Sequence, residues 1–382
     1  MKFIHTSDWH IGRLFQNIAL LEDQVFVLQQ LKAYAIEYKV DAVIIAGDIF
    51  DRSVPPAEAV DALNDFLEQL TIELNIPVIM ISGNHDSAKR LGFGAKQMQT
   101  SGLHIVSNLK DSNKPITIES DTGPVNVYGI PYHDPIEVRE TFGCEAKTYD
   151  EAHTFVVERI LETKPSDIPA VLISHCFIDG AEESESERPL SIGGADRVSF
   201  EPLKSFNYVA LGHLHAPQYK GYEHIRYSGS LLKYSFSEYK QKKGITLVEF
   251  DKKGLVSHQH LALEPRHDFR VLEGTLADIL EGAKTDKHPD DYLLIKLTDK
   301  HDILDPMGQL RQVYPNTLQL ERSQFSLASG SRLVADVGLK RTEQQVFTDF
   351  FEQVTGDELT EFQKEVLLET IQQVKTANEH NS

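Results

Sequence analysis

Residues 77–87 read PVIMISGNHDS, an apolar run that ends in three consecutive polar side chains. The run is rich in Val and Ile, which is typical of a strand buried on both faces of a parallel sheet. Asn84, His85 and Asp86 follow at its carboxyl end, which is where open α/β sheets bind ligands. The stretch therefore predicts a buried strand that carries polar side chains to the binding edge of a sheet.

Other apolar runs and two helix patterns flank this stretch. The strand-like runs are residues 2–6, 40–46, 125–130, 170–174, 208–211, 225–228, 245–250 and 258–263. Residues 20–38 and 56–74 show apolar side chains at three- and four-residue steps, namely Leu21, Val25, Leu28, Leu31 and Ala35, then Val60, Leu63, Leu67 and Leu70. This alternation predicts an α/β layered sandwich, with strands that become partly antiparallel after about residue 170.

Four more polar clusters follow apolar runs. They are Asp8-Trp9-His10, Gly47-Asp48, His175 and Gly212-His213-Leu214-His215. Each cluster alone is weak evidence, since Gly-Asp after a strand is commonly a turn. Together they bring Asp, Asn and His to one sheet edge, a ligand set that suits Mn²⁺, Fe or Zn²⁺. Two metals about 3.5–4 Å apart would clamp the attacking and leaving oxygens of a phosphoryl displacement.

This order of motifs resembles the calcineurin-like metallophosphoesterases over residues 1–215. The resemblance implies an α-β-β-α sandwich and two divalent metal ions, with Mn²⁺ expected. It implies that one metal is held by Asp8, His10, Asp48 and His215, and the other by Asp48, Asn84, His175 and His213. Asp48 would then bridge the two.

The resemblance also implies a catalytic role for the segment Asn84-His85-Asp86. His85 would lie over the scissile phosphate and protonate or stabilise the leaving oxygen. Asp86 would either orient the His85 imidazole or cap its own loop. His5 lies inside the first strand and is interpreted as structural.

Within the family, the chain is most similar to bacterial DNA nuclease subunits that work with a coiled-coil ATPase. The closer similarity rests on residues 5–12 (HTSDWHIG), 46–51 (AGDIFD) and 227–230 (YSGS). It implies a duplex exonuclease and single-strand or hairpin endonuclease in DNA end processing, repair and recombination. It also implies a homodimer of the nuclease subunit inside a heterotetramer. Asp51 stands where archaeal and eukaryotic relatives carry a DNA-positioning histidine, as is common in bacterial members.

The pattern predicts four regions along the chain, and the resemblance implies their roles. Residues 1–265 form the nuclease domain, 266–322 a small α+β capping and DNA-contact domain, 323–340 a linker and 341–382 a hairpin of two amphipathic helices. The hairpin carries Phe347, Phe350, Phe351 and Phe362. Two helices cannot bury such an aromatic face by themselves, which favours a partner. The resemblance implies that this partner is the ATPase, because the corresponding hairpin of the family docks on its coiled coils.

The charge of the chain opposes a DNA substrate. It has 38 Lys+Arg against 58 Asp+Glu, a net charge of −20, and such a chain repels DNA at long range. Metals, a partner or local cations would have to supply the close contacts, and the candidates are Lys89, Arg90, Lys233 and the run 240–243 (KQKK). No run approaches the roughly 18 apolar residues of a membrane span. With only two cysteines and no apolar leader, a cytoplasmic protein is expected.

Two other functions stay open. One is a phosphoesterase of the same fold that acts on nucleotides or phosphoproteins, and the other is a non-catalytic binding module. Ser53 and Asp86 stand where the protein phosphatase signature has Gly and Glu, which favours a nuclease. The complete ligand set and His85 argue against a binding module.

Overall fold

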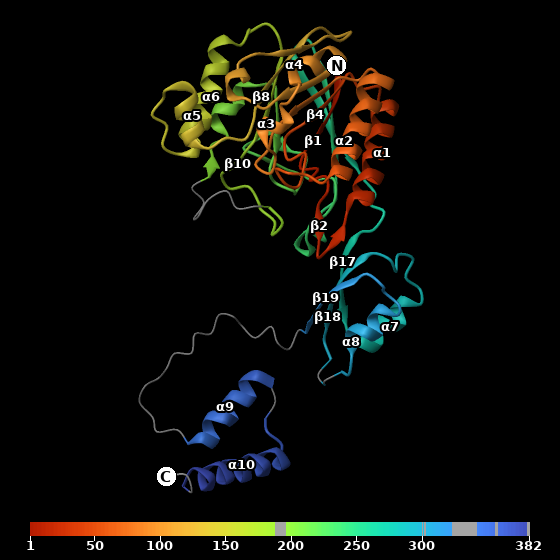
Figure 1. The fold of residues 1–382 in the computed structure, drawn as a ribbon, viewed down its shortest axis with the longest axis vertical. Coiled ribbons are helices and arrows are strands. Elements are labelled where there is room, and N and C mark those ends of the chain that lie inside the picture. The colour runs from red at the N-terminus through yellow and green to blue at the C-terminus, as the bar shows by residue number, and fades with distance from the viewer. Residues whose placement is uncertain (188–195, 300, 302, 323–341, 356–357, 380–382) are drawn as a thin grey trace. The chain divides into compact units, whose positions relative to one another are not determined.

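The computed structural model describes residues 1–187, 196–299, 301, 303–322, 342–355 and 358–379 of the 382-residue chain. The chain divides into two compact units, Met1–Arg270 and Val271–Ser382 (Figure 1). No helix in the described ranges is long and apolar enough to cross a lipid bilayer. The linker expected at 323–340 lies outside the described residues.

The first unit contains a six-stranded sheet with a parallel centre. Its strand order is β16-β15-β1-β4-β5-β6, in which β15 and β16 run antiparallel to their neighbours. The strands are β1 Lys2–Thr6, β4 Ala42–Ile45, β5 Val78–Ile81, β6 Leu103–Val106, β15 Gly244–Asp251 and β16 Gly254–Ala262. Every residue of β4 and β5 is buried, as their continuous apolar runs predict.

A second six-stranded sheet packs face to face against the first. Its order is β13-β14-β12-β9-β8-β7, with only the two edge strands antiparallel. The strands are β7 Ile116–Ile118, β8 Val125–Ile130, β9 Ala170–His175, β12 Tyr208–Gly212, β13 Gln218–Lys220 and β14 Tyr222–Tyr227. The core between the sheets includes Phe3, Ile44 and Ile79 from the first sheet, and Val127, Val171 and Tyr208 from the second.

Helices form the two outer layers of this unit. The helices α1 Leu21–Glu37 and α2 Ala57–Glu68 lie beside the first sheet, and α5 Pro135–Phe142 and α6 Tyr149–Thr163 lie beside the second (Figure 1). Val156 and Ile160 of α6 belong to the same apolar cluster as Leu172 and Val209 of the second sheet. The predicted α-β-β-α sandwich is confirmed.

Two details of the predicted helix faces are wrong. The periodicity predicts buried positions for Val25 and Val60, but they are 36% and 44% exposed. Gln24 is fully buried in place of Val25, because its amide hydrogen-bonds to the loop after β1. The second helix ends at Glu68 and continues as a wider π-helical turn, Gln69–Glu73.

Several elements of the structure are not predicted from the sequence. These are the edge strands β7 and β13 of the second sheet, the edge strand β6 of the first sheet, and helices α5 and α6. The start of α6 carries a usable signal, because Thr148 and Glu151 form a reciprocal capping box. Short edge strands have no comparable signal.

Short elements fill the loops of the first unit. They are the hairpin β2 Leu14–Phe15 and β3 Ile18–Ala19, the pair β10 Phe177–Ile178 and β11 Arg197–Val198, and the helices α3 Ala88–Leu91 and α4 Ala95–Met98. The helix α3 begins directly after Ser87, and therefore close in sequence to His85.

The second unit is built from alternating strands and helices. They are β17 Phe269–Gly274, whose first two residues belong to the first unit, α7 Leu276–Ala283, β18 Tyr292–Leu297, α8 Pro306–Arg311 and β19 Thr317–Arg322, with sheet order β17-β18-β19. Leu276, Ile279, Leu293 and Leu310 belong to its core. The tail forms α9 Glu343–Thr355 and α10 Glu361–Glu379, which contact each other. Gly356, expected to end the first tail helix, lies outside the described residues.

Candidate metal centre

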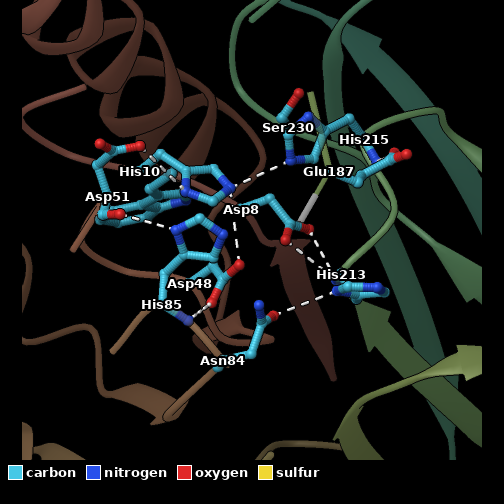
Figure 2. A network of polar contacts seen from close by, with 12 residues as sticks. Asp8, His10, Asp48, Asp51, Asn84, His85, Glu187, His213, His215 and Ser230 are labelled. Carbon is cyan, nitrogen blue, oxygen red and sulfur yellow. Dashed lines mark hydrogen bonds and ion pairs between the residues drawn. The ribbon is translucent and has the colours of Figure 1, made fainter. Parts of the chain in front are cut away.

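The five polar clusters meet at the carboxyl ends of strands from both sheets. Figure 2 labels residues of four of them, namely Asp8 and His10, Asp48, Asn84 and His85, and His213 and His215. The loops after β1, β4 and β5 come from the first sheet, and the ends of β9 and β12 come from the second. The structure thus brings together all seven expected metal ligands, which are Asp8, His10, Asp48, Asn84, His175, His213 and His215. Six of the seven are buried, and Asn84 is half-buried.

The backbone at four of these residues is left-handed. The φ angles are 52° at Asp8, 46° at His10, 51° at Asp48 and 104° at His213. Non-glycine residues in this region cost of order 1–3 kcal/mol each and cluster at functional sites. Hydrogen bonds between loops hold the conformation, since the His10 amide donates to the Asp48 carbonyl at 3.0 Å. The His213 amide donates to the Asp8 carboxylate at 3.0 Å.

One half of the site is formed by Asp8, His10 and His215. Ligand atoms of these three residues all lie within 4.8 Å of one another. Nδ1 of His215 faces a carboxylate oxygen of Glu238 at 3.3 Å, so this nitrogen carries the proton and Nε2 carries the lone pair. That lone pair points towards Nε2 of His10, 3.1 Å away. Burial lowers the pKa of both imidazoles, which keeps them neutral and able to bind a cation.

The other half is formed by Asn84, His175 and His213. Nδ1 of His175 donates to the Ala46 carbonyl at 2.8 Å, which leaves the lone pair on Nε2. That atom lies 2.9 Å from the amide oxygen of Asn84 and 3.5 Å from Oδ2 of Asp48. Nδ1 of His213 lies 3.2 Å from the same amide oxygen. Acceptors that face one another in a buried space fit a divalent cation.

Asp48 stands between the two halves. Its Oδ2 is 3.7 Å from Nε2 of His10 and 3.5 Å from Nε2 of His175, while Oδ1 accepts the His85 amide at 2.9 Å. Burial raises the pKa of nearby Asp8 well above its usual value, and the charge of Asp48 adds to that shift. Cations would stabilise the two neighbouring buried carboxylates of Asp8 and Asp48. The set of possible ligand atoms therefore fits divalent metal ions.

Close approach of the chain at Gly83 leaves room for Asp48. A Cβ atom on Gly83 would lie 2.1 Å from Oδ1 of Asp48 and 2.3 Å from its backbone nitrogen. No side chain fits there without moving the carboxylate. The glycine in the motif Gly-Asn-His therefore has a steric reason at this site.

His85 lies beside the two halves, with its ring centroid 4.6 Å from that of His10 (Figure 2). Its Nδ1 donates to the backbone carbonyl of Asp51 at 2.7 Å. This hydrogen bond fixes the ring and makes Nε2 the atom that can meet a substrate oxygen.

Of the two roles open for Asp86, the contacts favour loop capping. Its carboxylate accepts the backbone amides of Ile49, Phe50 and Gly83 at 3.1, 3.0 and 2.9 Å. Burial and the charge of Asp48 raise the pKa of Asp86 to about 7, against the lowering effect of those amides. Asp86 thus joins the loops after β4 and β5 and positions His85 through the backbone.

An acid–base pair behind His215 is not predicted from the sequence. Glu238 and Lys243 are buried and form an ion pair, and Lys243 also donates to the His215 carbonyl at 2.7 Å. Burial alone would raise the pKa of Glu238, but Lys243 and His215 hold it below its usual value. The prediction that Lys243 contacts DNA is wrong, because its ammonium group is buried in this pair. No local pattern distinguishes this lysine from its neighbours Lys240 and Lys242.

Gln24, which is also not predicted from the sequence as a supporting residue, stabilises the loop after β1. Its amide nitrogen donates to the carbonyls of Trp9 and His10 at 3.0 and 2.7 Å, and its oxygen accepts the Gly12 amide at 3.0 Å. The sequence feature that could have identified Gln24 is its position, as a polar residue, on the apolar face of the helix. His5, expected to be structural, is buried and hydrogen-bonds to the Tyr208 hydroxyl at 2.9 Å.

The candidate DNA contacts have different environments. Lys89 and Arg90 are exposed on α3, and Arg90 donates to the Ser53 carbonyl at 2.8 Å. Lys233 is 10% exposed and its ammonium group is bound by Asp268 and the Tyr239 carbonyl. In the tail, Phe347, Phe350 and Phe362 are 43%, 58% and 74% exposed, and Phe351 is partly buried.

Comparison with known proteins places this site in a family context. Residues 1–217 match the model of the calcineurin-like phosphoesterases, and residues 265–355 match a model described as the type 5 capsule protein repressor C-terminal domain. The chain is 35% identical to an SbcCD nuclease subunit of Staphylococcus epidermidis, over 96% of both chains. It is 37% identical to the protein of the same name in Staphylococcus saprophyticus, over 94% of this chain and 95% of that one.

Glu238→Gln should weaken metal binding by roughly 10–100-fold, the usual effect of removing a carboxylate behind a ligand histidine. The amide cannot hold the charge of Lys243 or the Nδ1 proton of His215 as the carboxylate does. Calorimetric titration with Mn²⁺ measures the change, and Glu249→Gln, which alters an exposed carboxylate on β15, is the matched control. Equal Mn²⁺ affinity in wild type and Glu238→Gln would show that Glu238 does not support the site.

Proposed function

The chain belongs to the calcineurin-like phosphoesterases and, within them, to the nuclease subunits of the SbcCD type, and from this premise we propose its reaction. We propose that it is a Mn²⁺-dependent DNA nuclease, both a duplex exonuclease and a single-strand or hairpin endonuclease. It would act in DNA repair, recombination and replication, and therefore in the cytoplasm. The observation that carries the proposal is the cluster of mutually facing acceptors around Asp48, with His85 beside it.

The proposed reaction is hydrolysis of a phosphodiester. When bound, two divalent cations supply Lewis-acid activation to the phosphoryl group and to the attacking water. Asp8, His10, Asp48 and His215 would hold one, and Asp48, Asn84, His175 and His213 the other. A P–O bond breaks, water adds to phosphorus, and the leaving oxygen needs a proton. Nε2 of His85 would supply that proton, because Nδ1 is bound to the Asp51 carbonyl.

The two alternative functions have less support. Relatives matched over nearly the whole chain are named nucleases, which disfavours a nucleotide phosphodiesterase or protein phosphatase. A non-catalytic module would have no need for four strained residues and seven converging ligands. Lys89, exposed on the helix that follows His85, is retained as the candidate DNA contact, whereas Arg90 donates to the Ser53 carbonyl and lines the groove assigned below to the homodimer. Lys233 is not retained, because its ammonium group is bound within the protein.

The partner we propose is an SbcC-like coiled-coil ATPase. The names of the relatives describe subunits of an SbcCD nuclease, and this chain has the tail expected to dock such a partner. Phe347 and Phe350 have ring centroids 6.5 Å apart on α9, and both are exposed. Helix faces of this kind suit docking against a coiled coil.

A groove near the catalytic loop supports the proposed homodimer of the nuclease subunit. It has a volume of about 710 Å³ and is lined mostly by apolar side chains, and its lining includes Phe50 and Ser87, the latter two residues after His85 in the chain. Phe93, Val54 and Ile72 are 82%, 61% and 55% exposed along it. Apolar surface of this extent on one face suits a second copy of the same chain.

The direct test of the function compares duplex DNA, single-stranded DNA and a small phosphodiester as substrates with Mn²⁺. We expect cleavage of all three and loss of cleavage with chelator. Hydrolysis of the small phosphodiester alone would indicate another phosphoesterase, and no hydrolysis of any substrate would indicate a binding module.

His85→Gln should lower the rate of cleavage by roughly 10²–10⁴-fold, the usual contribution of a general acid. Mn²⁺ affinity should stay near that of wild type, because His85 is not among the proposed ligands. Single-turnover cleavage and Mn²⁺ titration of the same preparation separate the two effects. Parallel loss of metal and activity would make His85 a ligand and overturn its assignment as the acid.

Replacing Phe350 and Phe362 together by Ser should weaken co-purification with an SbcC-like ATPase at least about tenfold, since buried aromatic anchors dominate interfaces. Cleavage of single-stranded DNA by the isolated chain should not change, because both residues lie in the tail. Ile36→Ser, which removes an apolar side chain 52% exposed on α1, is the control. Undiminished binding of the double variant would place the docking site elsewhere.

A further inference from the structure

A cavity with basic side chains in its lining lies at one edge of the sandwich. Its volume is about 340 Å³, and Arg226, Lys242, His258 and His260 contribute to its lining. None of these residues is a proposed metal ligand. All four belong to the first unit of the chain.

Strand register explains how these side chains meet. Arg226 of β14 pairs with Ala210 of β12, which belongs to the core between the sheets, so Arg226 points towards the first sheet. On that sheet, His258 pairs with Val248, another residue of the same core. His260 lies two residues further along the same face of β16. The space between the sheets therefore ends in basic side chains at this edge.

The cations in this cavity have few acidic neighbours. Nη1 of Arg226 donates to Nε2 of His258 at 2.8 Å and to the Glu223 carbonyl at 2.9 Å. Among the residues that the structure describes, no carboxylate oxygen lies within 4.0 Å of this guanidinium. Burial and the charge of Arg226 lower the pKa of His258, against the raising effect of the exposed Glu223 side chain. Lys242 is exposed.

We propose that this pocket binds a phosphate group. The Arg226 guanidinium and the Lys242 ammonium group, with two neutral imidazoles beside them, offer N–H donors that a tetrahedral oxyanion accepts. The chain as a whole has a net charge of −20, so anions have no general attraction to it and the local cluster would select them.

The pocket adjoins the metal centre along the chain. Ala216 and Pro217, which line it, directly follow the proposed ligand His215. Two residues span at most about 7 Å, so the wall of the pocket formed by Ala216 and Pro217 lies close to the backbone of His215. The phosphate would belong either to a nucleic-acid strand or to a free nucleotide. The inference that a nucleic-acid strand supplies the phosphate rests on the proposed function. The inference that the pocket binds an anion does not.

The test measures binding to the full-length chain without metal, because bound metal ions would themselves bind a phosphate. The probes are inorganic phosphate, dAMP and a short single-stranded DNA, and calorimetry measures their affinity. Arg226→Gln should weaken phosphate and dAMP binding at least about tenfold, the scale of a charge-assisted hydrogen bond. The control is Arg159→Gln, which removes an arginine that stacks on Phe142 and does not line the pocket. This variant should bind phosphate and dAMP with the affinity of wild type.

The DNA probe separates the two sources. If a strand supplies the phosphate, Arg226→Gln should reduce the slope of log affinity against log salt by about one. If only phosphate and dAMP respond, the pocket takes a free nucleotide. His258→Gln is the milder second variant should Arg226→Gln fold poorly by circular dichroism.

Two results would overturn the proposal. One is equal phosphate affinity in wild type, Arg226→Gln and His258→Gln, and the other is no saturable binding of any probe to the metal-free chain. Hydrolysis of a small phosphodiester by the metal-loaded wild type tests the proposed function separately. A negative result in that assay does not contradict the phosphate pocket, and a negative binding result does not contradict the proposed function.

Discussion

Buried acceptors that face one another are the constraint on which the site depends. Nε2 of His175 lies 2.9 Å from the Asn84 amide oxygen and 3.5 Å from the Asp48 carboxylate, in surroundings that exclude most solvent. Burying polar groups without partners costs several kcal/mol, and burying carboxylates costs more. Cations shared among these atoms would offset that cost. On the proposed ligand assignment, metal binding would therefore contribute to the stability of this arrangement of side chains.

The two-sheet scaffold is what brings these acceptors together. Parallel strands of each sheet end at the same edge, so loops that are far apart in sequence meet there. Left-handed backbone at Asp8, His10, Asp48 and His213 turns the side chains inward, and hydrogen bonds between loops hold that conformation. Asp86 and Gln24 act in the same way, since each binds several backbone groups of the loops that carry ligands. The site is thus positioned mainly through the backbone.

The sequence predicts those parts that a local pattern encodes. Continuous Val- and Ile-rich runs identify strands such as β4 and β5, and the polar residues at their ends identify the candidate ligands. What the sequence could not predict depends on tertiary contacts. Lys243 resembles any surface lysine until Glu238 is placed opposite it, and Arg226 resembles any strand residue until the sheets are paired. Short edge strands such as β7 and β13 were missed because their residues lack the alternation or length that makes a strand recognisable.

The central claim is that Asp48 bridges two metal ions, and Mn²⁺ stoichiometry in Asp48→Asn tests it most directly. Asp111→Asn, which changes an exposed carboxylate, is the control. The account predicts two ions per chain in wild type and control, and weakened binding of both ions in Asp48→Asn, because one carboxylate serves both halves of the site. Two ions bound at wild-type affinity by Asp48→Asn, or loss of one ion with the other unaffected, would contradict it.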